Sequence, residues 1–122
     1  MVVQSYRDLR VWQLAMDFVV EVYEATNSFP DRETYGLSSQ LQRAAVSIPS
    51  NVAEGHSRAS TREYLHHISI AMGSLSELET QLLIAARLGY ISAEQISAFV
   101  ETSDHLGRQL RNLQKSLRAK LK

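Results

Sequence analysis

The sequence predicts an all-α fold, an up-down-up-down four-helix bundle that occupies residues 1–122 as a single domain. Four segments repeat apolar residues at helical spacing, and none alternates as a strand would. The connections expected at residues 55–59 and 89–91 are short, which favours antiparallel neighbours. The chain has 122 residues and no Cys, a length that supports one domain whose core needs no disulfide.

The first helix is expected from Tyr6 to Ser28, because the residue before Pro30 is pushed out of the α region. It carries two apolar seams about 110° apart on the helical wheel. Together they are wider than the stripe that a bundle helix needs, so one seam is expected to face another subunit. The alternative is that this helix is central in its own bundle. The seam assigned to the core is Leu9, Trp12, Met16, Val19 and Tyr23, and the seam assigned to the other subunit is Val11, Ala15, Phe18, Val22 and Ala25.

The second helix is expected from Leu37 to Glu54, with Gly55 at its C-terminal stop. Pro49 lies inside this helical pattern and removes one backbone donor, which predicts a kink or a break near residues 46–48. The hydroxyls of the neighbouring serines are expected to bond the backbone carbonyls that the proline frees.

The third helix follows a predicted capping box formed by Ser60 and Glu63, and it ends at Leu88. Gly73 costs this helix about 1 kcal/mol relative to Ala, and close approach of a neighbouring helix is one reason to tolerate it.

The fourth helix is also expected to start with a capping box, formed by Ser92 and Gln95. It continues almost to the C-terminus with leucines at heptad-like spacing. It would be about 45 Å long, against about 27 Å for the second helix. Its last turns, including Leu113 and Leu117, are therefore expected to overhang and to pack on another subunit.

Charge is distributed unevenly although 13 basic residues balance 13 acidic residues. Residues 1–107 carry seven basic and 13 acidic side chains, whereas residues 108–122 carry six basic side chains and no acid. Five of these cations are spaced three and four residues apart on the side of the helix opposite its leucines, and they form the basic stripe: Arg108, Arg111, Lys115, Arg118 and Lys122. Such a row matches the phosphates of RNA or DNA. The alternative is a solvated cationic last turn that complements the helix dipole.

Catalytic and metal sites are not supported. Glu63 and His66 have the Glu-x-x-His spacing of di-iron bundles, but this motif occurs once and falls on the polar face. The chain has no Gly-x-Ser-x-Gly elbow and no glycine-rich phosphate loop. We therefore expect no catalytic residues, no metal, no cofactor and no small-molecule substrate. The absence of an apolar run of about 20 residues, and of a signal-peptide layout, predicts a soluble cytoplasmic protein.

Several sequence blocks resemble the bacterial proteins of the ribosomal-RNA intervening-sequence family. The most distinctive is Ser47-Ile48-Pro49-Ser50-Asn51-Val52-Ala53-Glu54-Gly55, and others are Tyr6-Arg7-Asp8-Leu9-Arg10-Val11-Trp12-Gln13, Tyr35-Gly36-Leu37, Arg43-Ala44-Ala45 and Leu88-Gly89-Tyr90. The resemblance implies a four-helix bundle without established catalytic residues. It also implies similarity to the accessory protein of diversity-generating retroelements, a basic ring-shaped pentamer that binds nucleic acid.

The functional expectation is a non-enzymatic homo-oligomer, a pentamer according to the resemblance, that binds RNA or DNA through the basic stripe. A second possible phosphate site is Arg43, Arg58 and Arg62. The alternative function is a protein-binding adaptor that does not contact nucleic acid. The residues expected at the oligomer interface are Val11, Phe18, Val22, Leu113 and Leu117.

Overall fold

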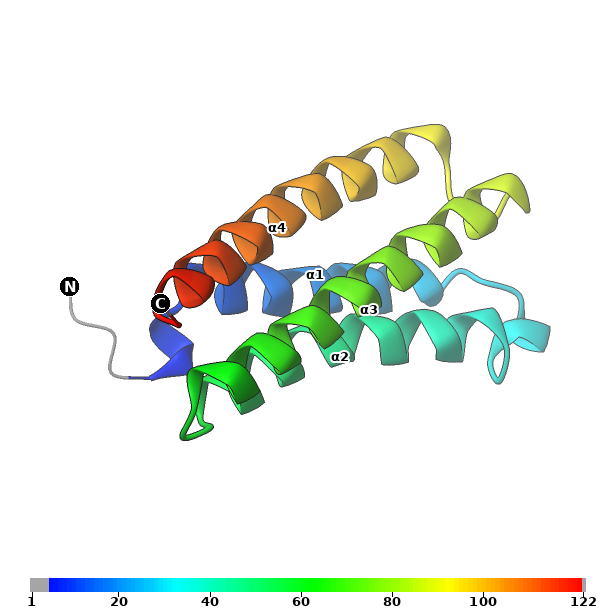
Figure 1. Ribbon diagram of the computed structural model, residues 1–122. Coiled ribbons are helices and arrows are strands. Elements are labelled where there is room, and N and C mark those ends of the chain that lie inside the picture. Colours follow the sequence, from blue (N-terminus) through cyan, green and yellow to red (C-terminus); the bar gives the residue numbers. More distant parts are fainter. Residues whose placement is uncertain (1–4, 122) are drawn as a thin grey trace.

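The computed structural model describes residues 5–121, and this part of the chain contains four α-helices, two short 3-10 helices and no β-strand. Consecutive α-helices pack side by side, and α4 returns alongside α1 (Figure 1). The predicted all-α bundle is confirmed. Its elements are η1 (Tyr6–Asp8), α1 (Arg10–Thr26), η2 (Asp31–Glu33), α2 (Leu37–His56), α3 (Thr61–Arg87) and α4 (Ala93–Ala119).

Local sequence signals set the starts of the two long helices. At α4 the Gln95 N–H donates to Ser92 Oγ at 3.1 Å and the Ser92 N–H donates to Gln95 Oε1 at 2.8 Å, so this capping box is complete. At α3 the Glu63 N–H donates to Ser60 Oγ, but the Glu63 carboxylate accepts from the Ser60 hydroxyl instead of the backbone. Gly89 ends the α3 region with a φ of 79°, which only glycine adopts cheaply.

The assignment of the two seams of α1 is wrong, because the structure exchanges them. The seam expected to face another subunit lies in the chain's own core, where Phe18 is 1% exposed and stacks on Phe99 of α4 with ring centroids 5.9 Å apart. Its other members, Val11, Ala15, Val22 and Ala25, are buried as well. The seam expected inside faces outward at Met16 and Tyr23, which are 41% and 43% exposed. Val11, Phe18 and Val22 are therefore core residues and not a free interface.

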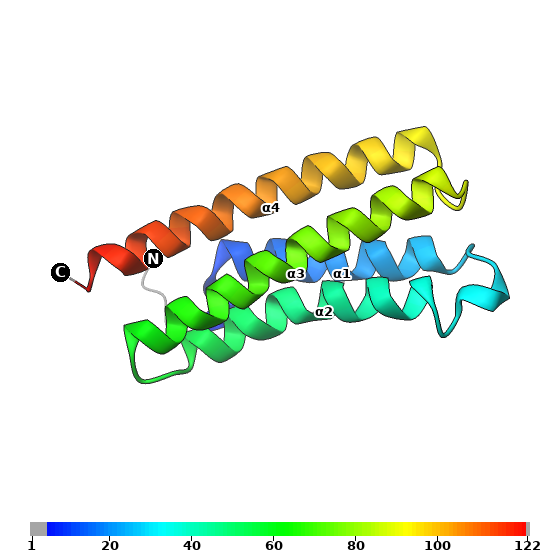
Figure 2. The same cartoon turned by 45° about the vertical axis from the view of Figure 1, so that its right-hand side comes forward.

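The expected overhang of the fourth helix is also wrong at Leu117, which is 4% exposed, while Leu113 is half-buried against the core. The physical reason is the length of α3. Helices α3 and α4 each have 27 residues and pack side by side, and α2 ends where α3 begins, at the same end of the bundle as the last turns of α4 (Figure 2). Leu121, beyond the last helical turn, is 42% exposed.

Helix α2 runs through Pro49 without interruption, so the predicted break is wrong, and the kink stays a prediction. The serine hydroxyls near the proline do not bond the freed carbonyls. Ser47 Oγ instead lies 2.7 Å from Ser74 Oγ of α3, and Ser50 is exposed. The hydroxyl of Ser47 thus joins two helices.

Close approach of α2 and α3 occurs at Gly55, not at Gly73. A Cβ added to Gly55 would lie 2.8 Å from the Cβ of His67 and 3.0 Å from the ring of Tyr64. A Cβ added to Gly73 would meet no atom within 4 Å. The expectation that Gly73 permits helix contact is therefore wrong.

These two glycines predict opposite effects of the same substitution. Gly55→Ala should lower the free energy of unfolding by about 1–3 kcal/mol, because the added methyl group overpacks the α2–α3 contact. Gly73→Ala should raise it by about 1 kcal/mol, the difference in helix propensity. Urea unfolding of both variants measures the effect. Equal stabilisation by the two substitutions would contradict the packing described at Gly55.

Candidate nucleic-acid interface

Four of the five predicted stripe residues lie exposed on α4, and the fifth, Lys122, lies outside the described residues. The opposite side of α4 is buried through Leu106 and Leu110, which are 1% and 0% exposed. This apolar side fixes the rotation of the helix, so the cations must point to solvent. The exposed members of the stripe are Arg108, Arg111, Lys115 and Arg118.

The fold gathers further cations at the end of the bundle where α4 finishes. The C-terminal turns of α4, the α2–α3 connection and η1 all lie at this end (Figures 1 and 2). They bring Arg58, Arg62, Arg7 and Arg10 to the same end as the stripe, and all four are exposed. We call this the cationic end. These arginines are far apart in sequence, so spacing alone does not place them together. The antiparallel order of the helices, which the sequence does predict, could have shown that they lie at the same end of the bundle.

The two halves of the bundle differ sharply in charge. If each α-helix is divided at its middle, the half at the cationic end comprises residues 5–18, 47–73 and 106–121. It carries nine basic and four acidic side chains, and the other half carries three basic and nine acidic ones. The basic residues of the first half are Arg7, Arg10, Arg58, Arg62, Arg108, Arg111, Lys115, Arg118 and Lys120, and the acidic residues of the second are Glu21, Glu24, Asp31, Glu33, Glu77, Glu79, Glu94, Glu101 and Asp104.

The second phosphate site considered from the sequence does not form one cluster. Arg43 lies in the acidic half of the bundle, in a surface groove between α2 and α3 that Glu77 also lines. Arg58 and Arg62 lie at the cationic end instead. Arg58 pairs with Glu54 at 3.5 Å, one helical turn earlier, and both side chains are about half exposed.

A chain of polar contacts connects α2 to α3 and ends at the carboxylate that pairs with Arg58. The Asn51 amide donates to the backbone oxygen of Ser47 at 2.8 Å, which leaves its Oδ1 to accept from His67 Nδ1 at 3.0 Å. His67 Nε2 lies 3.4 Å from Glu54, the carboxylate that also holds Arg58. The distinctive stretch at residues 47–55 thus ties the two helices together and orients one arginine of the cationic end.

This polar chain has the residue types of a hydrolase but not the geometry. A serine nucleophile needs a direct hydrogen bond to its general base. Here the Asn51 amide stands between the hydroxyl of Ser47 and the imidazole of His67, and an amide does not act as the base. The arrangement supports packing of α2 on α3, where burial also raises the pKa of Tyr64.

The Glu-x-x-His motif remains on the surface. Glu63 accepts a hydrogen bond from Ser60, and His66 is exposed and packs edge-on against His67. Within residues 5–121, no group of three or more His, Asp or Glu side chains is arranged to hold a metal ion.

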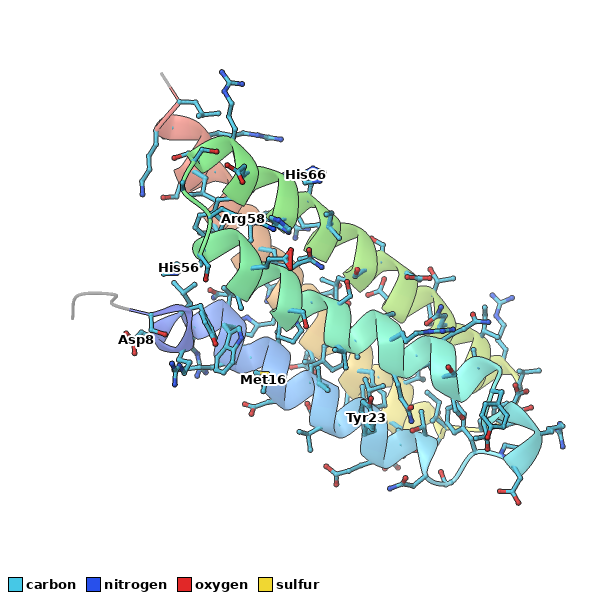
Figure 3. The ribbon with its side chains drawn as sticks, turned by 90° about the horizontal axis from the view of Figure 1, so that it is seen from below. Asp8, Met16, Tyr23, His56, Arg58 and His66 are labelled. Atoms are coloured by element: carbon cyan, nitrogen blue, oxygen red, sulfur yellow. The ribbon has the colours of Figure 1, made fainter. Side chains whose placement is uncertain are left out.

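An apolar patch runs along the outer side of α1 and reaches α2. We call it the α1–α2 face, and Figure 3 shows two of its members, Met16 and Tyr23, along α1. Trp12 packs edge-on against Tyr6 with centroids 5.4 Å apart, and both line a shallow cavity of about 330 Å³ together with Pro49. The members of the α1–α2 face are Trp12, Met16, Val20, Tyr23 and Val46, of which the last four are 40–56% exposed.

Comparison with known proteins identifies the family. Residues 7–112 match the family described as 23S rRNA-intervening sequence protein, which covers most of the chain. The chain belongs to this family. The match runs from Arg7 in η1 through all of α1, α2 and α3 to Asn112 in α4, so the resemblance seen in the sequence blocks is confirmed.

A solved structure has the same fold as this member of the intervening-sequence family. It is the crystal structure of a protein of unknown function from the S23 ribosomal protein family of Bacteroides thetaiotaomicron. The two superpose with a TM-score of 0.79 at 23% sequence identity, over 86% of this chain and 95% of the other. No curated protein matches the chain. In the described part of the family member, no helix is both long and apolar enough to span a membrane.

Proposed function

We propose that this protein is a non-enzymatic, homo-oligomeric bundle of the cytoplasm that binds RNA or DNA phosphates through the basic stripe of α4. The observation that carries the proposal is the exposure of four stripe cations in a segment without acids. They are arranged along about 15 Å of helix. Cations in such a row contact phosphates without reading bases, so the binding should depend on salt and not on sequence.

Self-assembly would raise the affinity of this surface. The α1–α2 face is the exposed apolar surface best suited to meet another copy, since it carries Trp12 and Tyr23, residue types enriched at interfaces. In a ring, as the family resemblance implies, the cationic ends of all copies would lie on one side. Several weak contacts to one nucleic acid then act together as avidity.

The test is a fluorescence-anisotropy titration of a labelled single-stranded RNA and a DNA of equal length at low salt. The variant replaces Arg111, Lys115 and Arg118 with Gln, which keeps helix propensity. Its affinity should fall by about tenfold or more for both nucleic acids. The plot of log affinity against log salt should also become flatter by up to about two units per engaged subunit for a single strand, or about three for duplex DNA, because each phosphate contact contributes about 0.7 or 0.9 respectively.

The matched control removes three cations from the acidic half of the bundle, by replacing Arg32, Arg43 and Arg87 with Gln. It changes net charge by the same amount and should keep most of the affinity. Equal losses in the two triple variants would show that net charge, and not the stripe, governs binding, and would refute the assigned site.

A second candidate function is that of a protein-binding adaptor. The exposed apolar side chains of the α1–α2 face favour it, because they could contact a different protein instead of another copy of this chain. The same titration separates the two functions. Wild-type protein that binds neither nucleic acid at low salt would favour the adaptor.

A further inference from the structure

The exposed charges of α4 follow a pattern that reverses sign at the middle of the helix. One position recurs every seven residues and is occupied by Glu94, Glu101, Arg108 and Lys115 in that order. All four side chains are exposed. A seven-residue repeat keeps side chains on one side of a helix, so a single line along α4 is anionic in its first half and cationic in its second.

Within residues 5–121, these four charged side chains have no ion-pair partner. Glu94 and Lys115 are separated by about 31 Å of helix, and Glu101 and Arg108 by about 10 Å. The ion pairs among residues 5–121 join Arg58 and His67 to Glu54, and neither involves α4.

A second copy of α4 in the antiparallel direction would complement this line. With a two-fold axis between Asp104 and His105, Glu94 lies opposite the second copy's Lys115, and Glu101 lies opposite the second copy's Arg108. The same two pairs repeat on the other side of the axis, so the contact is isologous and closes with two copies. A parallel alignment would place like charges opposite each other.

We propose that two copies of this chain pack antiparallel through α4, each placing its basic half against the acidic half of the other. The surface beside α4 suits this partner. A groove of about 560 Å³ runs between α1 and α4 and spans the middle of α4, from Ala98 to Arg108. Leu14 and Ala98 supply its apolar part, and Asp17 and Glu21 extend its acidic side onto α1.

No ion pair within residues 5–121 involves the carboxylates on the acidic side of the groove, although Arg108 lines its other end. Burial, together with the neighbouring charges of Asp17 and Glu24, raises the pKa of Glu21 above its usual value. Arginines from the second copy would relieve this repulsion. The groove therefore favours a cationic helix, and the chain's own α4 is a cationic helix of the required length.

This pairing is independent of the α1–α2 face, and the two contacts differ in salt dependence. Exposed ion pairs are screened at high salt, whereas apolar contacts are not. The pairing also covers the basic stripe, so a second copy and a nucleic acid would compete for it. That competition, unlike the pairing itself, rests on the proposed function.

Light scattering after size exclusion, without nucleic acid, tests the pairing. The wild-type mass at low salt should be twice the mass at about 1 M salt, where the Debye length is about 3 Å. One variant, Glu94→Lys with Glu101→Lys, and a second, Arg108→Glu with Lys115→Glu, should each show half the wild-type mass at low salt. All four positions are exposed, so circular dichroism should show unchanged helicity.

Mixing these two variants tests directly whether the opposite charges of two α4 helices pair. An equimolar mixture should regain the doubled mass, because the seven-residue line of α4 is then entirely cationic in one variant and entirely anionic in the other. The pairing is overturned if either variant keeps the wild-type mass, if the wild-type mass does not change with salt, or if the mixture of folded variants does not associate. Since no nucleic acid is present, these outcomes leave the proposed function to its own titration.

Discussion

A glutamate in place of Val22 should unfold the chain, whereas a glutamate in place of Val20 should leave it folded and lower the mass of its assembly. Val22 is 0% exposed, and Val20 is 56% exposed on the same helix. An unpaired carboxylate in the core costs several kcal/mol, which is comparable to the whole stability of about 5–15 kcal/mol for a domain. A carboxylate at Val20 stays in water in the single chain and becomes costly only when the α1–α2 face meets another copy.

Circular dichroism and light scattering on the two variants measure these effects. Val22→Glu should lose most of its helical signal, and Val20→Glu should keep the wild-type signal with a lower mass. The control variant Ser69→Glu adds a negative charge at an exposed position of α3. It should change neither the helical signal nor the mass of the assembly. Full helicity of Val22→Glu with dissociation would instead mean that the seam of Val22 faces another subunit.

The seams of α1 show what sequence reasoning left open. Periodicity located the helix, although Tyr6–Asp8 form the separate η1 and α1 is Arg10–Thr26. Both seams, however, are apolar and both have helical spacing. The chemical difference lies in the polar atoms. Trp12 and Tyr23 each carry a group that needs a hydrogen-bond partner when buried, whereas the seam of Phe18 has none and includes alanines that let helices approach. The seam without polar atoms is the one that the structure buries.

Local signals predicted the boundary between α3 and α4 because they act over a few residues, whereas Gly55, expected as the stop of the second helix, lies inside α2. The capping box at Ser92 and the stop at Gly89 depend on contacts within one turn, and both are confirmed. Such local signals could not show which of Gly55 and Gly73 lies against a neighbouring helix. Both are helical glycines, and only the position of His67 on the neighbouring helix shows which of them has no room for a side chain.

The candidate site was predicted only in part for the same reason. The basic stripe is a property of one helix, so spacing alone gives its residues. The cationic end requires the topology, which brings Arg7, Arg10, Arg58 and Arg62 to the same end of the bundle. The topology also separates Arg43 from them, although a list of basic residues suggests one group.

Lysine footprinting measures whether the basic stripe contacts phosphates. The three lysines of the chain are Lys115, Lys120 and Lys122, so an amine-acylating reagent reports on the side chains of the C-terminal segment alone. A phosphate that accepts from the ammonium of Lys115 holds its protons and excludes the reagent. The acylation rate at each lysine is read by mass spectrometry, with and without saturating single-stranded RNA, and with a neutral polymer as control. Acylation of Lys115 should be severalfold slower with RNA and unchanged with the neutral polymer. An unchanged rate at Lys115, under conditions where anisotropy shows the RNA to be bound, would contradict a contact between the stripe and phosphates.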